Sequence, residues 1–355
     1  MLLVMLSTAV LSGAGGSCTL ARTGAATIGV AKNLTPPATA RPADAKAFLH
    51  LVADLPLPGA PVRFDYQSAD PATGMLYLSH MNDGHVVAFD TRGRRVVGNI
   101  PDMPRVTGVW VVPELHKLYA SVTGHHHVAV IDVPALSVRA TPGPIGFPDG
   151  IAYAPEANRI FVSDESGGGE LVIDGATDQV VATIPLGGEA GNTKYDPGSG
   201  CILVAVQTRN EIVAIDPATA AVVGHYALTK GDHPHGMLVD VPGRLLFVAN
   251  QGNATMLVID LRTMEVTDIQ PVGGDPDVLA FDPVLHRLYV ATESGGLWSY
   301  QVVGRRLVVE GALALPHAHT VSVDPATHLV YLPLESLGGK PTLRILSGSA
   351  ARPYR

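Results

Sequence analysis

The sequence has few cysteines and no excess of basic charge, and each of these shortages excludes a class of protein. Its 355 residues include 2 cysteines, which excludes a disulfide-dense scaffold. Lys and Arg number 24 against 32 Asp and Glu, so no basic surface is available for a phosphate backbone and we expect no nucleic-acid partner. Gly-rich phosphate loops, Gly-X-Ser-X-Gly elbows and Cys-X-X-Cys motifs are absent, which disfavours nucleotide, serine-hydrolase and c-type haem chemistry.

The N-terminus carries a short apolar run typical of an export signal. Residues 2–11 are nearly all apolar and small residues follow, a length that suits a signal-peptide core and is too short to span a bilayer. We expect residues 1–17 to be a signal peptide or a lipoprotein leader. The protein is then periplasmic, secreted or lipid-anchored at the cell surface, with membrane contact only through a lipid on Cys18.

The leader is followed by a segment that predicts little structure. Residues 18–46 are rich in Ala, Thr and Pro without apolar periodicity, so we expect a flexible linker. Cys201 lies in an apolar strand pattern, and with Cys18 removed or lipidated we expect it to be a buried thiol without a partner. The folded domain is predicted to occupy residues 47–348, with residues 349–355 as a C-terminal tail.

The strongest signal in the chain is an internal repeat. A proline that ends one strand and opens a turn recurs at intervals of 41 to 45 residues, at Pro71, Pro113, Pro155, Pro197, Pro242, Pro283 and Pro325. A strand rich in β-branched and aromatic residues follows each proline, and a further strand that usually ends in Asp comes next. We expect that Asp to close the next turn by accepting backbone N–H groups.

Seven repeats of this period predict a closed ring of blades. The fold class is all-β, a seven-bladed β-propeller of four-stranded antiparallel blades, because strands follow strands with no helical segments between them. The last repeat lacks a fourth strand, whereas residues 48–52 form an apolar strand pattern before the first repeat. We predict that this N-terminal strand completes the last blade and closes the ring.

Two repeat segments carry a resemblance to a known family. The sequences LFVAN at residues 246–250 and LYVAT at 288–292 resemble the YVTN repeat of bacterial seven-bladed propellers, over about residues 48–346. The resemblance implies the propeller fold. It leaves function open, because many members are uncharacterised exported proteins and related propellers act as lactonases, lyases, copper enzymes or binding modules.

Histidines and carboxylates recur at one position of the repeat. In a propeller the loops that enter the inner strands open on one face around the channel, together with the loops between second and third strands. Asp149, His235, Asp277 and His319 lie about six residues before the repeat proline, at the channel ends of predicted inner strands. The ring is therefore expected to gather imidazoles and carboxylates from distant repeats.

Imidazole and carboxylate together favour a divalent transition metal such as Zn, Cu, Ni, Fe or Mn. We predict His235, Asp277 and His319 as metal ligands, with His80 as the next candidate. Other polar residues of the same face are predicted to bind a ligand or transfer protons: His233, His317, Asn250 and Glu293. Arg63 is expected either to hold a ligand carboxylate or to pair with Asp65 or Asp149.

Three other interpretations of this face remain open. A general base such as Asp149 or Glu165 would activate a metal-bound water and support a lactonase-like hydrolase or a lyase. An all-oxygen site would use Asp149, Asn192 and Asp277, as the lactonase resemblance implies, although its matching Glu is missing. A wet channel mouth can also be lined by polar residues that bind no ion.

Two functions follow from these features. One is an exported binding propeller that holds a small ligand, a metal or a protein partner at the channel mouth. The alternative is a metal-dependent hydrolase or lyase that uses the same residues.

Overall fold

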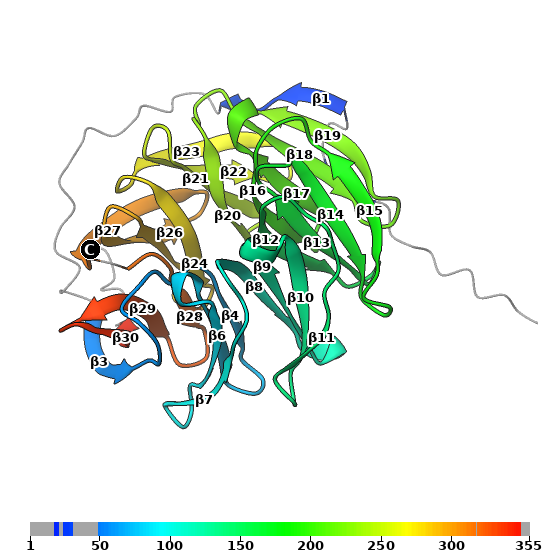
Figure 1. Ribbon diagram of the computed structural model, residues 1–355. Coiled ribbons are helices and arrows are strands. Elements are labelled where there is room, and N and C mark those ends of the chain that lie inside the picture. Colours follow the sequence, from blue (N-terminus) through cyan, green and yellow to red (C-terminus); the bar gives the residue numbers. More distant parts are fainter. Residues whose placement is uncertain (1–17, 21–23, 31–48, 317, 349–355) are drawn as a thin grey trace, which may run out of the picture.

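The structure, a computed structural model, describes residues 18–20, 24–30, 49–316 and 318–348. The predicted leader and C-terminal tail lie outside these residues. Within them the chain forms seven sheets arranged as a ring around a central channel (Figure 1). The predicted all-β seven-bladed propeller of antiparallel blades is confirmed.

The first three blades follow one another along the chain, each running from an inner to an outer strand. Blade one contains β4 (Gln67–Asp70), β5 (Met75–His80), β6 (His85–Asp90) and β7 (Arg95–Ile100). Blade two contains β8 (Val106–Val112), β9 (Lys117–Val122), β10 (His127–Asp132) and β11 (Ser137–Ala140). Blade three contains β12 (Pro148–Ala154), β13 (Arg159–Asp164), β14 (Gly169–Asp174) and β15 (Val180–Pro185).

The next three blades repeat this order. Blade four contains β16 (Ala190–Asp196), β17 (Cys201–Val206), β18 (Glu211–Asp216) and β19 (Ala221–Ala227). Blade five contains β20 (Pro234–Asp240), β21 (Leu245–Asn250), β22 (Thr255–Asp260) and β23 (Glu265–Pro271). Blade six contains β24 (Pro276–Asp282), β25 (Arg287–Thr292), β26 (Gly296–Val303) and β27 (Arg306–Ala314). Short 3₁₀ turns interrupt some loops: η2 (Met81–Asp83), η3 (Pro113–Leu115), η4 (Thr123–His125) and η5 (Gln207–Arg209).

Blade seven joins the two ends of the propeller. It contains β28 (Ser322–Asp324), β29 (Leu329–Leu337), β30 (Lys340–Gly348) and, as its outer strand, β3 (Leu49–Pro56). Strand β3 pairs antiparallel with β30, which places the blue N-terminal strand beside the red C-terminal one in Figure 1. The predicted closure is confirmed, and it removes the exposed edge that a three-stranded last blade would present.

Aspartates close the turns as expected. The carboxylate of Asp90 accepts backbone N–H groups of Arg92 and Gly93 at 3.0 and 2.9 Å. Four other third-strand aspartates accept backbone N–H groups of the following turn in the same way: Asp132, Asp174, Asp216 and Asp260. Since Asp satisfies the turn locally, its recurrence is a structural feature of the repeat.

The N-terminal segment differs from the expected flexible linker. Cys18 and Cys201 form a disulfide with Cα atoms 4.8 Å apart, so the expectation of an unpaired Cys201 is wrong, and a thiol in this bond is unavailable for a lipid. Strand β1 (Gly24–Thr27) pairs parallel with β19, and β2 (Gly29–Val30) pairs parallel with β23. Blades four and five therefore have five strands each.

Burial accounts for the packing of residues 18–20 and 24–30 on the propeller. Ile28 is 1% exposed and packs, with Leu20, in one apolar cluster with Tyr226 and Val266 of the outer strands. The open edges of β19 and β23 supply hydrogen-bond partners that a sequence pattern does not reveal. Among the described residues, no helix is both long and apolar enough to cross a bilayer.

Candidate functional site

The inner strands of blades two to six are irregular near their first residues. Their pairing with the second strand shifts register there, between Pro148 and Ile151 in blade three and between Pro276 and Leu279 in blade six, for example. A bulge of this kind re-aims side chains away from the regular alternation of a strand. Asp149, His235 and Asp277 all lie inside these irregular segments.

Glycines make it possible for adjacent blades to approach closely at the first residues of the inner strands. A Cβ atom added to Gly236 would lie 1.9 Å from the backbone oxygen of Asp277 in the next blade. Gly108 has the same relation to the backbone oxygen of Asp149, also at 1.9 Å. Any side chain at these positions would push apart the strand ends that carry the site residues.

Three buried residues from three blades form a compact group of acid and imidazole ligand atoms. Asp65, Asp277 and His319 are 3–5% exposed, and one ligand atom from each lies within 4.8 Å of the others. His319 Nε2 lies 3.1 Å from Asp65 Oδ1 and 2.9 Å from Asp277 Oδ2. Among the described residues this is the one group of three such side chains that converges.

A second imidazole continues the group toward the centre of the channel. His235 Nε2 lies 3.0 Å from the other carboxylate oxygen of Asp277. It also lies 3.4 Å from the hydroxyl of Tyr66. His235 therefore contacts the predicted ligand Asp277 but is not one of the three converging residues.

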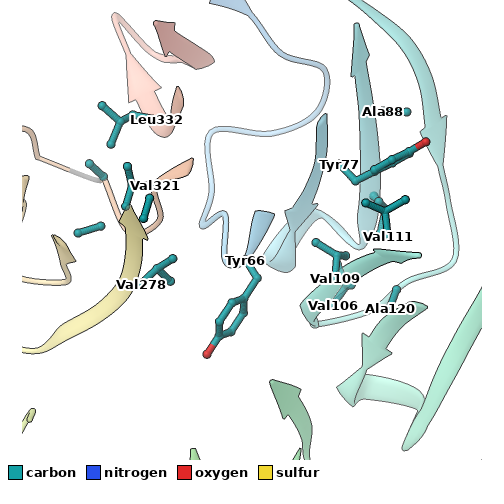
Figure 2. Close-up of a cluster of buried hydrophobic side chains, with 14 of the residues drawn as sticks. Tyr66, Tyr77, Ala88, Val106, Val109, Val111, Ala120, Val278, Val321 and Leu332 are labelled. Carbon is teal, nitrogen blue, oxygen red and sulfur yellow. The ribbon is translucent and has the colours of Figure 1, made fainter. Parts of the chain in front are cut away.

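Tyr66 connects this chain of contacts to a carboxylate deeper in the channel. Its hydroxyl donates to Asp149 Oδ2 at 3.0 Å and accepts from Asn192 Nδ2 at 2.7 Å. Figure 2 shows the Tyr66 ring between Val278 of blade six and Val109 of blade two. Tyr66 therefore hydrogen-bonds two of the three residues of the alternative oxygen site, Asp149 and Asn192.

The charges of the group are mutually dependent. Burial disfavours a charged ring, but the carboxylate of Asp277 outweighs it and raises the pKa of His235 to about 9. The carboxylates of Asp277 and Asp65 raise the pKa of His319 to about 10 against the same burial. Burial opposes ionisation of Asp277 too, yet the two imidazoles hold the pKa of that carboxyl well below its usual range.

Asp149 behaves differently from Asp277. Burial is the main influence and raises the pKa of Asp149 to about 7, while the charge of His235 acts in the opposite direction. Burial likewise raises the pKa of Tyr66 well above its ordinary value. The centre of the channel therefore holds a carboxyl that exchanges its proton near neutral pH.

Arg63 and Glu293 lie at the rim of the converging group. Arg63 Nη2 lies 2.5 Å from His319 Nε2, 3.5 Å from Asp65 and 3.4 Å from Glu293 Oε1. Glu293 Oε1 is also 3.8 Å from His319 Nδ1. The expected pairing of Arg63 with Asp65 is present, and the guanidinium is near enough to a ligand bound at His319 to contact its charge.

His80, the next predicted ligand, is not among the three converging residues. Its ring is fully buried and stacks on Phe64 with centroids 3.9 Å apart. Nδ1 lies 3.6 Å from Asp83, and burial lowers the pKa of this imidazole. Residues of the loop before blade one, Gly59, Ala60 and Val62, lie against His80.

Other predicted residues have separate outcomes. His233 is half exposed, and its Nδ1 lies 3.1 Å from Asp232 in its own loop. Asn250 is buried and donates to the carbonyl groups of Val248 and Thr255, so it supports its own hairpin rather than a ligand. Glu165 accepts a hydrogen bond from Gln207 Nε2 at 3.0 Å. His317 lies outside the described residues.

Asp65 and Tyr66 are the members of the site that sequence reasoning missed. Asp65 lies six residues before Pro71, the same offset that separates Asp149, Asp277 and His319 from their repeat prolines. Applying that offset to every blade would have identified it. Tyr66 carries no such signal, because its role depends on which side chains surround its hydroxyl.

Comparison with known proteins identifies the fold and no more. No family model matches the sequence, and no curated protein matches it either. Among solved structures, hydrazine synthase from Kuenenia stuttgartiensis is similar, with a TM-score of 0.70 at 14% identity over 83% of this chain and 97% of that one. An identity this low carries no statement about activity.

Proposed function

We propose that this propeller binds a divalent transition-metal ion at Asp65, Asp277 and His319 and presents it to a small ligand entering the channel mouth. The observation that carries the proposal is the convergence of two carboxylates and one imidazole, all buried, from blades one, six and seven. Two oxygens and one nitrogen suit Zn, Mn or Fe better than a cation that prefers an all-oxygen shell.

The carboxylate of Asp277 strengthens the case for a cation. It is buried, and its two oxygens lie 3.0 Å from His235 Nε2 and 2.9 Å from His319 Nε2. A buried carboxylate is ordinarily paired with positive charge, a role that a metal ion shares with these imidazoles. Arg63 and a proton on His319 compete with the metal for the same charge, and the ion must displace that proton from Nε2.

Export fits the covalent structure of the chain. A disulfide between Cys18 and Cys201 is compatible with an oxidising compartment outside the cytosol. We propose that the protein is secreted or periplasmic after loss of residues 1–17, and that it belongs with the YVTN-type propellers its repeats resemble. A small molecule or a protein at the channel face remains the expected partner.

The test is direct measurement of metal on purified protein. We expect about one equivalent of Zn²⁺ or Mn²⁺ per chain by calorimetry and metal analysis, and loss of that equivalent in the variant Asp65→Asn combined with His319→Gln. The matched control His233→Gln removes an exposed imidazole close by and should keep the metal. Equal binding in the double variant and the parent, with both folded by circular dichroism, would falsify the proposal.

A hydrolytic role is the second candidate, and the environment of Asp149 favours it. A carboxyl with a pKa raised to about 7 by burial is suited to accept a proton from an attacking water. The base form grows as pH rises, so hydrolysis of an ester or lactone in the presence of Zn²⁺ should increase up to about pH 7 and level off above it. The variant Asp149→Asn should abolish that rise, and a parent protein silent on all such substrates would exclude the role.

A further inference from the structure

The channel has a cavity at the end opposite Asp65, Asp277 and His319, together called the metal group. A cavity of about 440 Å³ lies among the inner strands, beyond Tyr66 and Asn192, which line its floor. Val241 and Pro197, both exposed, line its rim, so it opens on the face that carries the repeat prolines. Its volume falls in the range of small-molecule sites.

The walls of this cavity are apolar. Aliphatic and aromatic side chains from six blades surround it, among them Trp110, Ile151, Met237, Phe281 and Val323. Its polar wall groups are largely satisfied: Ser322 donates to Gln67 at 2.9 Å, and the Tyr66 hydroxyl donates to Asp149. A ligand that enters would bury apolar surface and meet few free hydrogen-bonding groups.

One charged side chain interrupts this apolar lining. Lys194 of β16 is the single ionisable amine or acid among the described lining residues other than tyrosines. Its Nζ lies 5.6 Å from the centre of the Trp110 ring, and no carboxylate of the described residues is within ion-pair distance of it. A half-buried ammonium without an anion is uncommon, because burial costs solvation that an opposite charge normally restores.

We propose that this cavity is a separate binding site for a small amphipathic organic anion, an aromatic or branched carboxylate or sulfonate. The anionic group pairs with Lys194, and the apolar body packs between Trp110 of blade two and Phe281 of blade six. The enclosing ring of inner strands admits a small molecule and excludes a protein segment. This site does not depend on the metal group, since Tyr66 and Asn192 separate the two.

Two probes that differ by one charge test the proposal. Anilinonaphthalene sulfonate carries the anion, and N-phenyl-1-naphthylamine has the same aromatic skeleton without it. We expect the parent protein to bind one sulfonate probe per chain and the variant Lys194→Met to bind it at least about tenfold more weakly, as loss of a partly buried ion pair requires. Affinity for the neutral probe should stay the same or increase.

Three controls locate the probe. Lys230→Met, at an exposed lysine away from the cavity, should leave both affinities unchanged. Val239→Trp fills the cavity and should remove both probes. His319→Gln should keep both probes while it loses metal, which separates a failure of this site from a failure of the metal site.

Two outcomes overturn the proposal. Equal affinity of the sulfonate probe for the parent and for Lys194→Met would show that the lysine does not recognise anions. Retention of the probes by Val239→Trp would show that they bind elsewhere; if that variant does not fold, the Lys194→Met comparison decides alone. A thermal unfolding midpoint of Lys194→Met close to that of the parent establishes that the protein tested is folded.

Discussion

The two ends of the channel are built by the same inner strands and yet differ completely in chemistry. The starts of these strands and the loops that enter them place Asp65, Asp277 and His319 together, whereas the later strand residues line an apolar cavity with Lys194 as its one cation. The strand starts are irregular in register and the strand ends are regular. The comparison teaches that bulges aim Asp277, and its neighbour His235, into the channel at one end, whereas Asp65 and His319 reach the same place from the loops before β4 and β28.

Electrostatic compensation also differs between the ends. At the metal end, each buried charge has an opposite charge about 3 Å away, as in the contacts of Asp277 with His235 and His319. At the apolar end Lys194 has an aromatic ring as its near neighbour, and burial lowers its pKa to about 8. We therefore expect substitutions at the two ends to have separable effects, which the following predictions test in order of size.

The largest expected effect is that of Asp277→Asn. The change removes the carboxylate shared by His235 and His319 and leaves two buried imidazoles without their anion, so the free energy of unfolding should fall by about 3–5 kcal/mol at pH 7. Chemical denaturation measures it. The variant should lose the metal, but under conditions in which it is folded it should still bind the neutral naphthylamine probe.

Asp275→Asn is the matched control, because Asp275 is exposed and lies two residues earlier in the chain. Its free energy of unfolding should stay within about 0.5 kcal/mol of the parent. If Asp275→Asn and Asp277→Asn destabilise equally, the shared carboxylate is not what holds the metal end together.

Gly236→Ala should have the next largest effect, because it tests the bulge itself. The new Cβ would meet the backbone oxygen of Asp277 at 1.9 Å, a clash that no rotamer relieves, and we expect a loss of about 3 kcal/mol with weaker metal binding. Gly274→Ala adds the same atom where the nearest neighbour is 3.6 Å away and should be nearly neutral. Thermal unfolding of the two variants distinguishes a local clash from a general cost of replacing glycine.

Tyr66→Phe tests the hydrogen bonds that the Tyr66 hydroxyl makes between the two ends of the channel. Without the hydroxyl, Asn192 Nδ2 loses its acceptor and Asp149 Oδ2 its donor, so we expect a loss of about 1–2 kcal/mol. Tyr153→Phe removes a half-buried hydroxyl that donates to Asn158 at the cavity wall and should cost less. If the floor separates two independent sites, Tyr66→Phe retains both the metal and the sulfonate probe.

The smallest expected effect is that of Glu293→Gln at the rim. Glu293 is over a third exposed and lies 3.4 Å from Arg63, so solvent screens the pair and the free energy of unfolding should change by less than about 0.5 kcal/mol. Metal stoichiometry should be unchanged. Loss of the metal in this variant would show that the rim supplies a ligand.

The ring and its closure were predictable because they depend on repetition. The spacing of the prolines defines the blades, and the missing fourth strand after residue 348 matches the spare strand β3. Part of the site was predictable for the same reason: Asp277 and His319 share one repeat offset and do meet. His80 followed a different argument, loop position alone, and Phe64 stacking removes it from the channel.

The disulfide and the added strands were not predictable from periodicity. Cys18 and Cys201 are 183 residues apart in the chain, and nothing in the composition indicates that residues 24–30 pair with the outer edges of blades four and five. Only the folded ring creates those edges. Tyr66 belongs to the same class, since its partners come from blades three, four and five.

By itself, the sequence determined the number of blades, their strand order and the turn chemistry, because these follow from local propensity and a regular spacing that any stretch of the chain displays. Tertiary structure alone decided which of the equivalent side chains converge, which are covered by a preceding loop, and that the far end of the channel holds an apolar cavity with one lysine. The physical reason is that ring closure and bulges bring together residues from distant blades at distances of about 3 Å, and such distances are properties of packing rather than of any one repeat.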